Sequence, residues 1–211
     1  MEFQGIIFDL DGVICSTDEY HYLAWKALAD RLGIPFDRER NNLLRGVSRM
    51  DSLAIILQKS EKTYTAEEKA AFAEEKNALY REYLKKMGPK DLSASVRETL
   101  DALRAKGYRM AIGSSSKNTP FILERIGLSG YFDAVADGNG ITHSKPHPEV
   151  FLKAAEMLSL APETCVVVED AHAGVQAAKA GGFHCAAMGD AREDPKADWH
   201  LAEFADLRAL L

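Results

Sequence analysis

The segment Ile6-Ile7-Phe8-Asp9-Leu10-Asp11-Gly12 runs from apolar residues into two carboxylates and a glycine. Residues two apart on a strand point to the same face, so Asp9 and Asp11 project together where the apolar run ends. Gly12 permits a sharp turn just beyond them. Two carboxylates this close repel each other and lose hydration when buried, so they require a cation or a shared proton. We therefore expect a hard metal ion beside a carboxylate nucleophile here, with a plain strand and polar turn as the alternative.

Strand and helix patterns alternate from about residue 93 to the C-terminus. Short apolar runs predict strands at residues 110–112, 134–136, 165–168 and 183–188. Helical spacing and end signals predict helices at residues 96–105, 119–126, 148–158 and 173–180, and a short closing helix at 202–211. Such alternation is typical of an α/β fold, in which helices cover both faces of a parallel sheet. We therefore predict a Rossmann-like parallel-sheet core.

Residues from about 18 to 88 interrupt this alternation with consecutive helical patterns. Tyr22, Trp25 and Leu28 stand at helical intervals, and a charged segment at 67–86 also carries apolar residues at that spacing. A chain of 211 residues suits one large domain or a domain with an insertion. We therefore predict a discontinuous core of residues 1–15 and 89–211 with a helical insert at 16–88.

Composition and charge disfavour several classes of protein. A formal net charge of −6 without any basic run argues against nucleic-acid and membrane-surface partners. No apolar stretch reaches the length of a membrane span, and no signal peptide is recognised. The three cysteines are widely spaced within or beside apolar runs, which predicts reduced, buried thiols in a cytoplasmic protein.

Polar residues follow the other predicted strands, and ligands gather at the carboxyl ends of strands in open α/β sheets. Gly113-Ser114-Ser115-Ser116 offers hydroxyl and backbone N–H groups to a phosphate, with helix capping as the alternative. Lys145 is held extended by Pro146 and could neutralise charge on a transferring phosphoryl group, with a solvated surface lysine as the alternative. Glu169 and Asp170 end a buried valine run, where Asp170 could alternatively be a helix N-cap.

A metal site at this sheet edge accounts for all four acids. Carboxylates at the end of a buried strand are costly unless something neutralises or solvates them. An all-oxygen donor set favours Mg²⁺ over zinc. We expect the ligands to be Asp9, Asp11 through its backbone carbonyl and Asp170, with Glu169 as a further ligand or a neighbour.

The Asp9-Leu10-Asp11-Gly12-Val13 motif, followed by Ser114, Lys145 and the acidic pair, resembles the haloacid dehalogenase superfamily of phosphohydrolases and phosphomutases. The resemblance implies that Asp9 is the nucleophile and Asp11 the general acid/base. It implies that Ser114 and Lys145 bind the phosphoryl group and that the Lys145-Pro146 bond is cis. It also makes the insert a cap domain, whose length suits four helices.

Several segments resemble the β-phosphoglucomutase group of that superfamily, among them residues 17–21, 46–49 and 116–118. The resemblance implies that Arg49 binds the phosphate that is not transferred. It also implies that Thr17 touches Asp11 and that His21 helps to position it.

The remaining candidates rest on the same resemblance. Ser52 would contact the sugar or a cap turn. Trp25 would contact the substrate, although packing within the cap is the role that its residue type favours. The full set of candidate substrate-binding residues is Thr17, His21, Trp25, Gly46, Arg49, Ser52, Ser116, Lys117 and Asn118.

This resemblance implies a phosphomutase that converts β-D-glucose 1-phosphate to D-glucose 6-phosphate through an aspartyl phosphate and β-D-glucose 1,6-bisphosphate. One alternative is a Mg²⁺-dependent sugar-phosphate phosphatase of the same superfamily, in which water replaces the sugar hydroxyl. A non-catalytic α/β binding module is a second alternative, against which the complete set of polar residues argues. The expected partner is a small sugar phosphate, and the expected state is a monomer because the cap must open and close.

Overall fold

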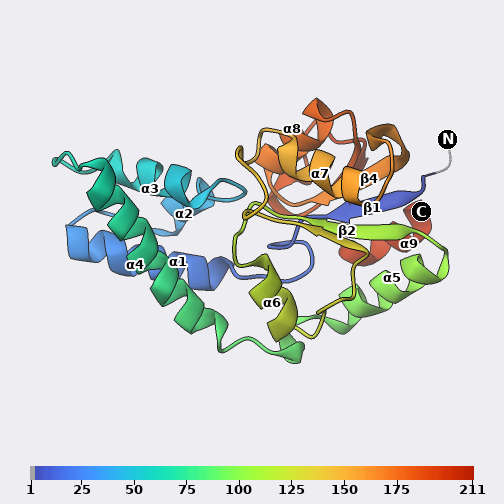
Figure 1. The fold of residues 1–211 in the computed structure, drawn as a ribbon, viewed down its shortest axis with the longest axis horizontal. Helices are drawn as coiled ribbons and strands as arrows, with labels where there is room; N and C mark the ends of the chain where they lie inside the picture. The colour runs from blue at the N-terminus through green and yellow to red at the C-terminus, as the bar shows by residue number, and fades with distance from the viewer. Residues whose placement is uncertain (1–2) are drawn as a thin grey trace.

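A six-stranded parallel sheet forms the centre of the larger lobe of the protein in a computed structural model, which describes residues 3–211 (Figure 1). The strand order is β3-β2-β1-β4-β5-β6, so the first strand lies in the middle. In register, Phe8 of β1 stands beside Ile112 of β2 and Val168 of β4. The strands are β1 (Gly5–Phe8), β2 (Arg109–Gly113), β3 (Ala134–Ala136), β4 (Cys165–Glu169), β5 (His184–Ala187) and β6 (Trp199–His200).

Helices cover both faces of this sheet, as Figure 1 shows. Side chains alternate along β1, so Ile6 and Phe8 pack on one face and Ile7 on the other. The first face is covered by α5 (Ala94–Ala105), α6 (Thr119–Arg125) and α9 (Leu207–Leu210), and the second by α7 (Glu149–Met157) and α8 (His172–Ala180). The prediction of a parallel α/β core is therefore confirmed.

The first four helices after β1 form the second lobe, which we call the cap (Figure 1). Trp25, Leu28, Leu53 and Ile56 are buried in a hydrophobic cluster of its own. The cap helices are α1 (Asp18–Leu32), α2 (Arg38–Asn42), α3 (Arg49–Leu57) and α4 (Ala66–Leu84). The expected four-helix insert is thus present, and its helices all fall within residues 16–88.

The structure differs from the sequence-based prediction mainly near the C-terminus. The edge strand β6 was not predicted, because two residues are too few to show strand periodicity. The segment 202–211 forms a 3-10 turn before the single turn of α9. The 3-10 turns are Pro89–Asp91, Pro162–Thr164, Gly189–Ala191 and Phe204–Asp206.

Two predictions about the whole chain can be compared with residues 3–211. Cys15, Cys165 and Cys185 are buried and unpaired, as expected. Among the described residues, no helix is both long enough and apolar enough to cross a membrane.

Candidate active site

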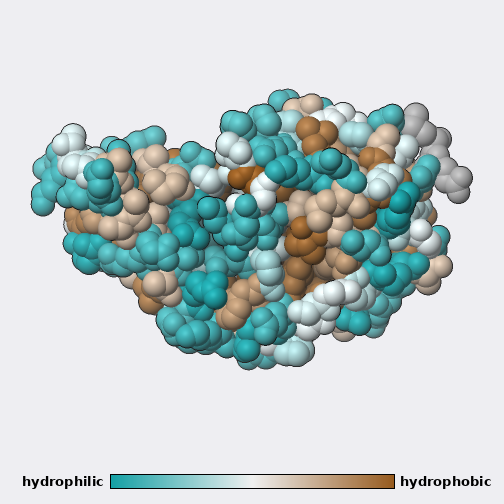
Figure 2. Space-filling view, viewed as in Figure 1, coloured by the Kyte–Doolittle hydropathy of each residue, from teal (hydrophilic) through white to brown (hydrophobic). Residues whose placement is uncertain are grey.

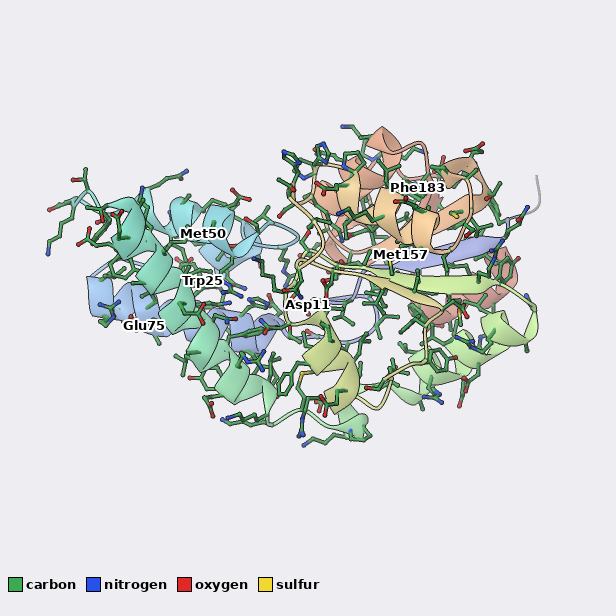
Figure 3. All side chains as sticks on the ribbon, in the orientation of Figure 1. Asp11, Trp25, Met50, Glu75, Met157 and Phe183 are labelled. Atoms are coloured by element: carbon green, nitrogen blue, oxygen red, sulfur yellow. The ribbon has the colours of Figure 1, made fainter. Side chains whose placement is uncertain are left out.

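A cavity of about 1290 Å³ opens where the cap meets the carboxyl ends of β1, β2 and β4. The surface is indented between the two lobes (Figure 2), and Asp11 lies where they meet (Figure 3). The cavity is lined from the core by Asp9, Asp11, Ser114, Ser116, Lys117, Asn118, Lys145, Glu169 and Asp170, and from the cap by His21, Trp25, Gly46, Arg49, Ser52, Lys76 and Tyr80. The site residues predicted from the sequence therefore gather around one cavity, except for Thr17, which is buried behind Asp11.

Lys145 is buried between two carboxylates at the floor of the cavity. Its Nζ donates hydrogen bonds to Asp9 Oδ1 and Glu169 Oε1, both at 2.5 Å. Burial alone would lower the pKa of Lys145, but the two carboxylates raise it above its ordinary value, so the ammonium is charged. Burial raises the pKa of Asp9 to about 7, although Lys145 opposes this shift. The Lys145-Pro146 bond is cis, which confirms the prediction.

Asp170 brings a further acid to the same place. Burial, together with repulsion from Glu169, raises the pKa of Asp170 to about 9. Gly12, at φ +89°, passes so close that an added Cβ would lie 1.9 Å from Asp170 Oδ2. Only glycine fits between the two strand ends at this point.

The donor set at this edge suits a divalent cation with oxygen ligands. Burial is the main cause of the raised pKa values of Asp9, Asp11 and Asp170, and neighbouring acids raise them further, so these carboxylates favour a bound cation or a proton. Asp9, the backbone carbonyl of Asp11 and Asp170 could hold such an ion. Glu169 is otherwise engaged, because its Oε2 accepts hydrogen bonds of 2.9 Å from the backbone N–H groups of Asp170 and Ala171. These hydrogen bonds suit Glu169 to a place beside the ion, where it orients Lys145 and does not itself bind the ion.

A chain of hydrogen bonds from the cap orients Asp11. The backbone N–H of Thr17 donates to Asp11 Oδ1 at 2.5 Å, and its hydroxyl donates to Oδ2 at 2.7 Å. The Tyr80 hydroxyl donates in turn to Thr17 Oγ1 at 2.9 Å. Burial raises the pKa of Asp11 even though both Thr17 bonds lower it, so this carboxyl is suited to holding a proton.

The cap side of the cavity contains a buried lysine that no sequence argument above identified. Lys76 on α4 is buried, and its Nζ lies 2.8 Å from His21 Nδ1 and 4.6 Å from the centre of the Trp25 ring. Burial lowers the pKa of Lys76 well below its ordinary value. Burial and the neighbouring cations Lys76 and Arg49 also lower the pKa of His21, so its neutral ring accepts the hydrogen bond from the lysine.

Side chains of two loops form polar contacts between the cap and the core. Asn118 accepts a hydrogen bond of 2.9 Å from Arg81 of α4, and its Nδ2 donates to Asn77 Oδ1 at 3.0 Å. Arg45 bridges Asp18 of α1 and Asp190 of the core. The cap thus touches the core through side chains on both rims of the cavity.

The remaining phosphate-binding and substrate-binding candidates come from both the core and the cap. Ser114 is buried, and its Oγ accepts a hydrogen bond of 3.3 Å from the backbone N–H of Ser116. Arg49 begins α3, where its Nη1 lies 3.5 Å from the exposed Glu74. Trp25 is almost fully buried in the cap cluster, so packing is its main contact, as its residue type favours.

Known proteins resemble this chain over most of its length. A model of haloacid dehalogenase-like hydrolases matches residues 3–182. A β-phosphoglucomutase of Bacillus subtilis (strain 168) is 39% identical over 206 residues, covering 97% of this chain and 91% of that protein. A phosphorylated carbohydrates phosphatase of Thermotoga maritima is 31% identical over 183 residues, covering 85% and 82%. A crystal structure of β-phosphoglucomutase from Clostridium difficile matches with a TM-score of 0.92 and 35% identity, covering 97% of this chain and 93% of that one.

Proposed function

The chain belongs to the haloacid dehalogenase-like hydrolases, and on that premise we propose that it is a phosphomutase converting β-D-glucose 1-phosphate to D-glucose 6-phosphate. The observation that carries the proposal is the presence of positive charge at both ends of one cavity. Lys145 lies at the core end beside Asp9, and Lys76 and Arg49 lie at the cap end. A bisphosphorylated sugar has two phosphates, so each end would hold one of them.

Asp9 serves as the nucleophile and carries the phosphoryl group as an aspartyl phosphate. The phosphorus–oxygen bond to Asp9 breaks as the sugar 6-hydroxyl attacks, and Asp11 takes the hydroxyl proton. The resulting β-D-glucose 1,6-bisphosphate turns round and returns its other phosphoryl group to Asp9. Asp11 then protonates the sugar 1-oxygen, and D-glucose 6-phosphate leaves.

The other residues stabilise charge and exclude water. Lys145 and Ser114 donate hydrogen bonds to the phosphoryl oxygens, while Arg49 holds the phosphate that is not transferred. Mg²⁺ held by Asp9, Asp11 and Asp170, with Glu169 beside it, would neutralise charge on the phosphoryl oxygens. Contacts from the cap through Arg45 and Asn118 support a closed cavity in which the sugar hydroxyl, and not water, reaches the aspartyl phosphate.

A Mg²⁺-dependent sugar-phosphate phosphatase is the second candidate, and the Thermotoga maritima relative favours it. It would use the same acids with water as the acceptor. A monomer and a cytoplasmic location stay predictions from the sequence.

Phosphorus NMR separates the two candidates. The protein would be mixed with Mg²⁺, β-D-glucose 1-phosphate and a trace of the 1,6-bisphosphate. We expect D-glucose 6-phosphate to accumulate without inorganic phosphate. Inorganic phosphate as the main product would instead identify a phosphatase and remove the proposed roles of His21 and Arg49.

A further inference from the structure

The loop between β3 and α7 carries two histidines, and the first residue of α7 is a glutamate; the proposed reaction uses none of the three. His143, His147 and Glu149 each offer a ligand atom, and these atoms lie within 4.8 Å of one another. Both histidines also line the cavity. In the sequence, they stand two residues before and two residues after Lys145. These potential metal ligands therefore flank Lys145, the lysine that the proposed reaction uses.

Glu149 is already held in place for such a role. Its Oε1 accepts a hydrogen bond of 2.9 Å from the backbone N–H of Thr142, and its Oε2 accepts one of 2.8 Å from that of His143. These bonds lower the pKa of Glu149 to about 2, so the carboxylate is charged at neutral pH. Each oxygen keeps a further lone pair for a cation.

The two imidazoles lie close to this carboxylate and are exposed. His143 Nδ1 is 3.1 Å from Glu149 Oε2, and the two ring centres are 4.6 Å apart. His147 Nδ1 accepts only a long bond of 3.3 Å, from the backbone N–H of Glu149. Exposed rings turn at small cost, so both can direct a nitrogen to a shared ion. Lys153 Nζ, at 3.5 Å from Glu149 Oε1, opposes a cation, but this exposed side chain can move into solvent.

We propose that His143, His147 and Glu149 bind Zn²⁺ at the rim of the cavity, separately from the acidic site at the strand ends. Two imidazoles and one carboxylate are a common zinc ligand set, and they leave a fourth position for water or another ligand. Mg²⁺ prefers oxygen ligands, so the two sites select different ions. The loop also contains Pro146 and Pro148, whose fixed φ angles reduce the entropy lost when the ligands converge.

The proposal is tested by adding Zn²⁺ to the Mg²⁺-saturated protein without any sugar phosphate. NMR of the imidazole nitrogens should show the His143 and His147 signals moving with one equivalent of Zn²⁺. The signals of His172, His184 and His200 should stay in place. Because no substrate is present, the result does not depend on which reaction the protein catalyses.

Titration calorimetry on variants supplies the control. His147→Gln should weaken Zn²⁺ binding by about tenfold or more, whereas the exposed His200→Gln should leave it unchanged. Equal Zn²⁺ affinity in His147→Gln and the unmodified protein would overturn the proposal. Binding that survives in His147→Gln but is lost in Asp170→Asn would assign the ion to the acidic site and would also overturn it.

Discussion

The two ends of the cavity bury a lysine in different ways. At the core end, Lys145 lies between Asp9 and Glu169, which compensate its charge. At the cap end, Lys76 is buried against the rings of Trp25 and Tyr80, and its polar neighbour is the neutral His21. The charge at the core end is therefore already compensated, whereas at the cap end Lys76 is buried with no salt bridge to a carboxylate of residues 3–211. An anionic group of the substrate would supply that partner.

The largest expected effect comes from Asp9, the proposed nucleophile at the core end. Asp9→Asn should lower phosphomutase turnover by at least about 10⁴-fold, because the amide cannot accept a phosphoryl group. Turnover would be followed by phosphorus NMR, with circular dichroism to check the fold. Substantial mutase activity in a folded Asp9→Asn protein would contradict the proposed reaction.

Lys145→Met tests whether the stability of the protein depends on charge compensation at the core end. The substitution leaves two buried carboxylates without their cation, so it should destabilise the Mg²⁺-free protein by roughly 3–5 kcal/mol. Urea unfolding measures this change in the free energy of unfolding. Lys117→Met is the matched control, since Lys117 lines the same cavity but is exposed, and its free energy of unfolding should change little.

Lys76→Met is expected to act in the opposite direction on stability. Removing a buried amine whose protonated form has no carboxylate partner should stabilise the fold by about 1–3 kcal/mol. The same change should raise KM for the sugar phosphate on the order of tenfold, since a charged hydrogen bond to phosphate is lost. Lys69→Met, on an exposed position of the same helix, should change neither quantity.

The pH dependence of the free energy of unfolding shows whether Lys76→Met stabilises the fold by removing a titrating amine or only by repacking the site. The pKa of Lys76 is lowered on folding, so the unfolded chain binds a proton that the folded protein lacks between the lowered value and 10.5. The free energy of unfolding should therefore rise with pH in this range. The contribution of Lys76 to this rise should be absent from Lys76→Met; an identical pH profile in the variant would argue against a buried, deprotonating lysine.

The comparison of the two ends also shows what the sequence could predict. Asp9, Ser114, Lys145 and Asp170 each follow a predicted strand, so the rule that ligands gather at strand ends predicts that these four residues lie together. Resemblance to a known family then predicted that Thr17 touches Asp11, which the hydrogen bonds confirm.

The cap end was harder to predict, because its chemistry depends on how helices pack. His21 and Lys76 are 55 residues apart and meet only because α4 lies against α1. In the sequence, Lys76 is one of two lysines on a highly charged helix. Its spacing from Ala73 and Tyr80, three residues before and four after, places it on the buried face, and this periodicity is the signal that could have identified it.

The smallest expected effect joins the two ends through the hydrogen-bond chain from Tyr80 to Asp11. Tyr80→Phe removes the bond to Thr17 Oγ1 while the buried ring keeps its packing, so kcat should fall about fivefold, corresponding to about 1 kcal/mol. Without that bond, Thr17 should hold the Asp11 carboxylate less firmly, which raises the pKa of Asp11 and shifts the acidic limb of the kcat profile to higher pH. KM should change little, because Tyr80 acts as a positioning residue. Tyr83→Phe on the same helix is the control, and an equal loss of kcat in both variants, without a shift of the pH profile, would mean that the chain does not set the protonation of Asp11.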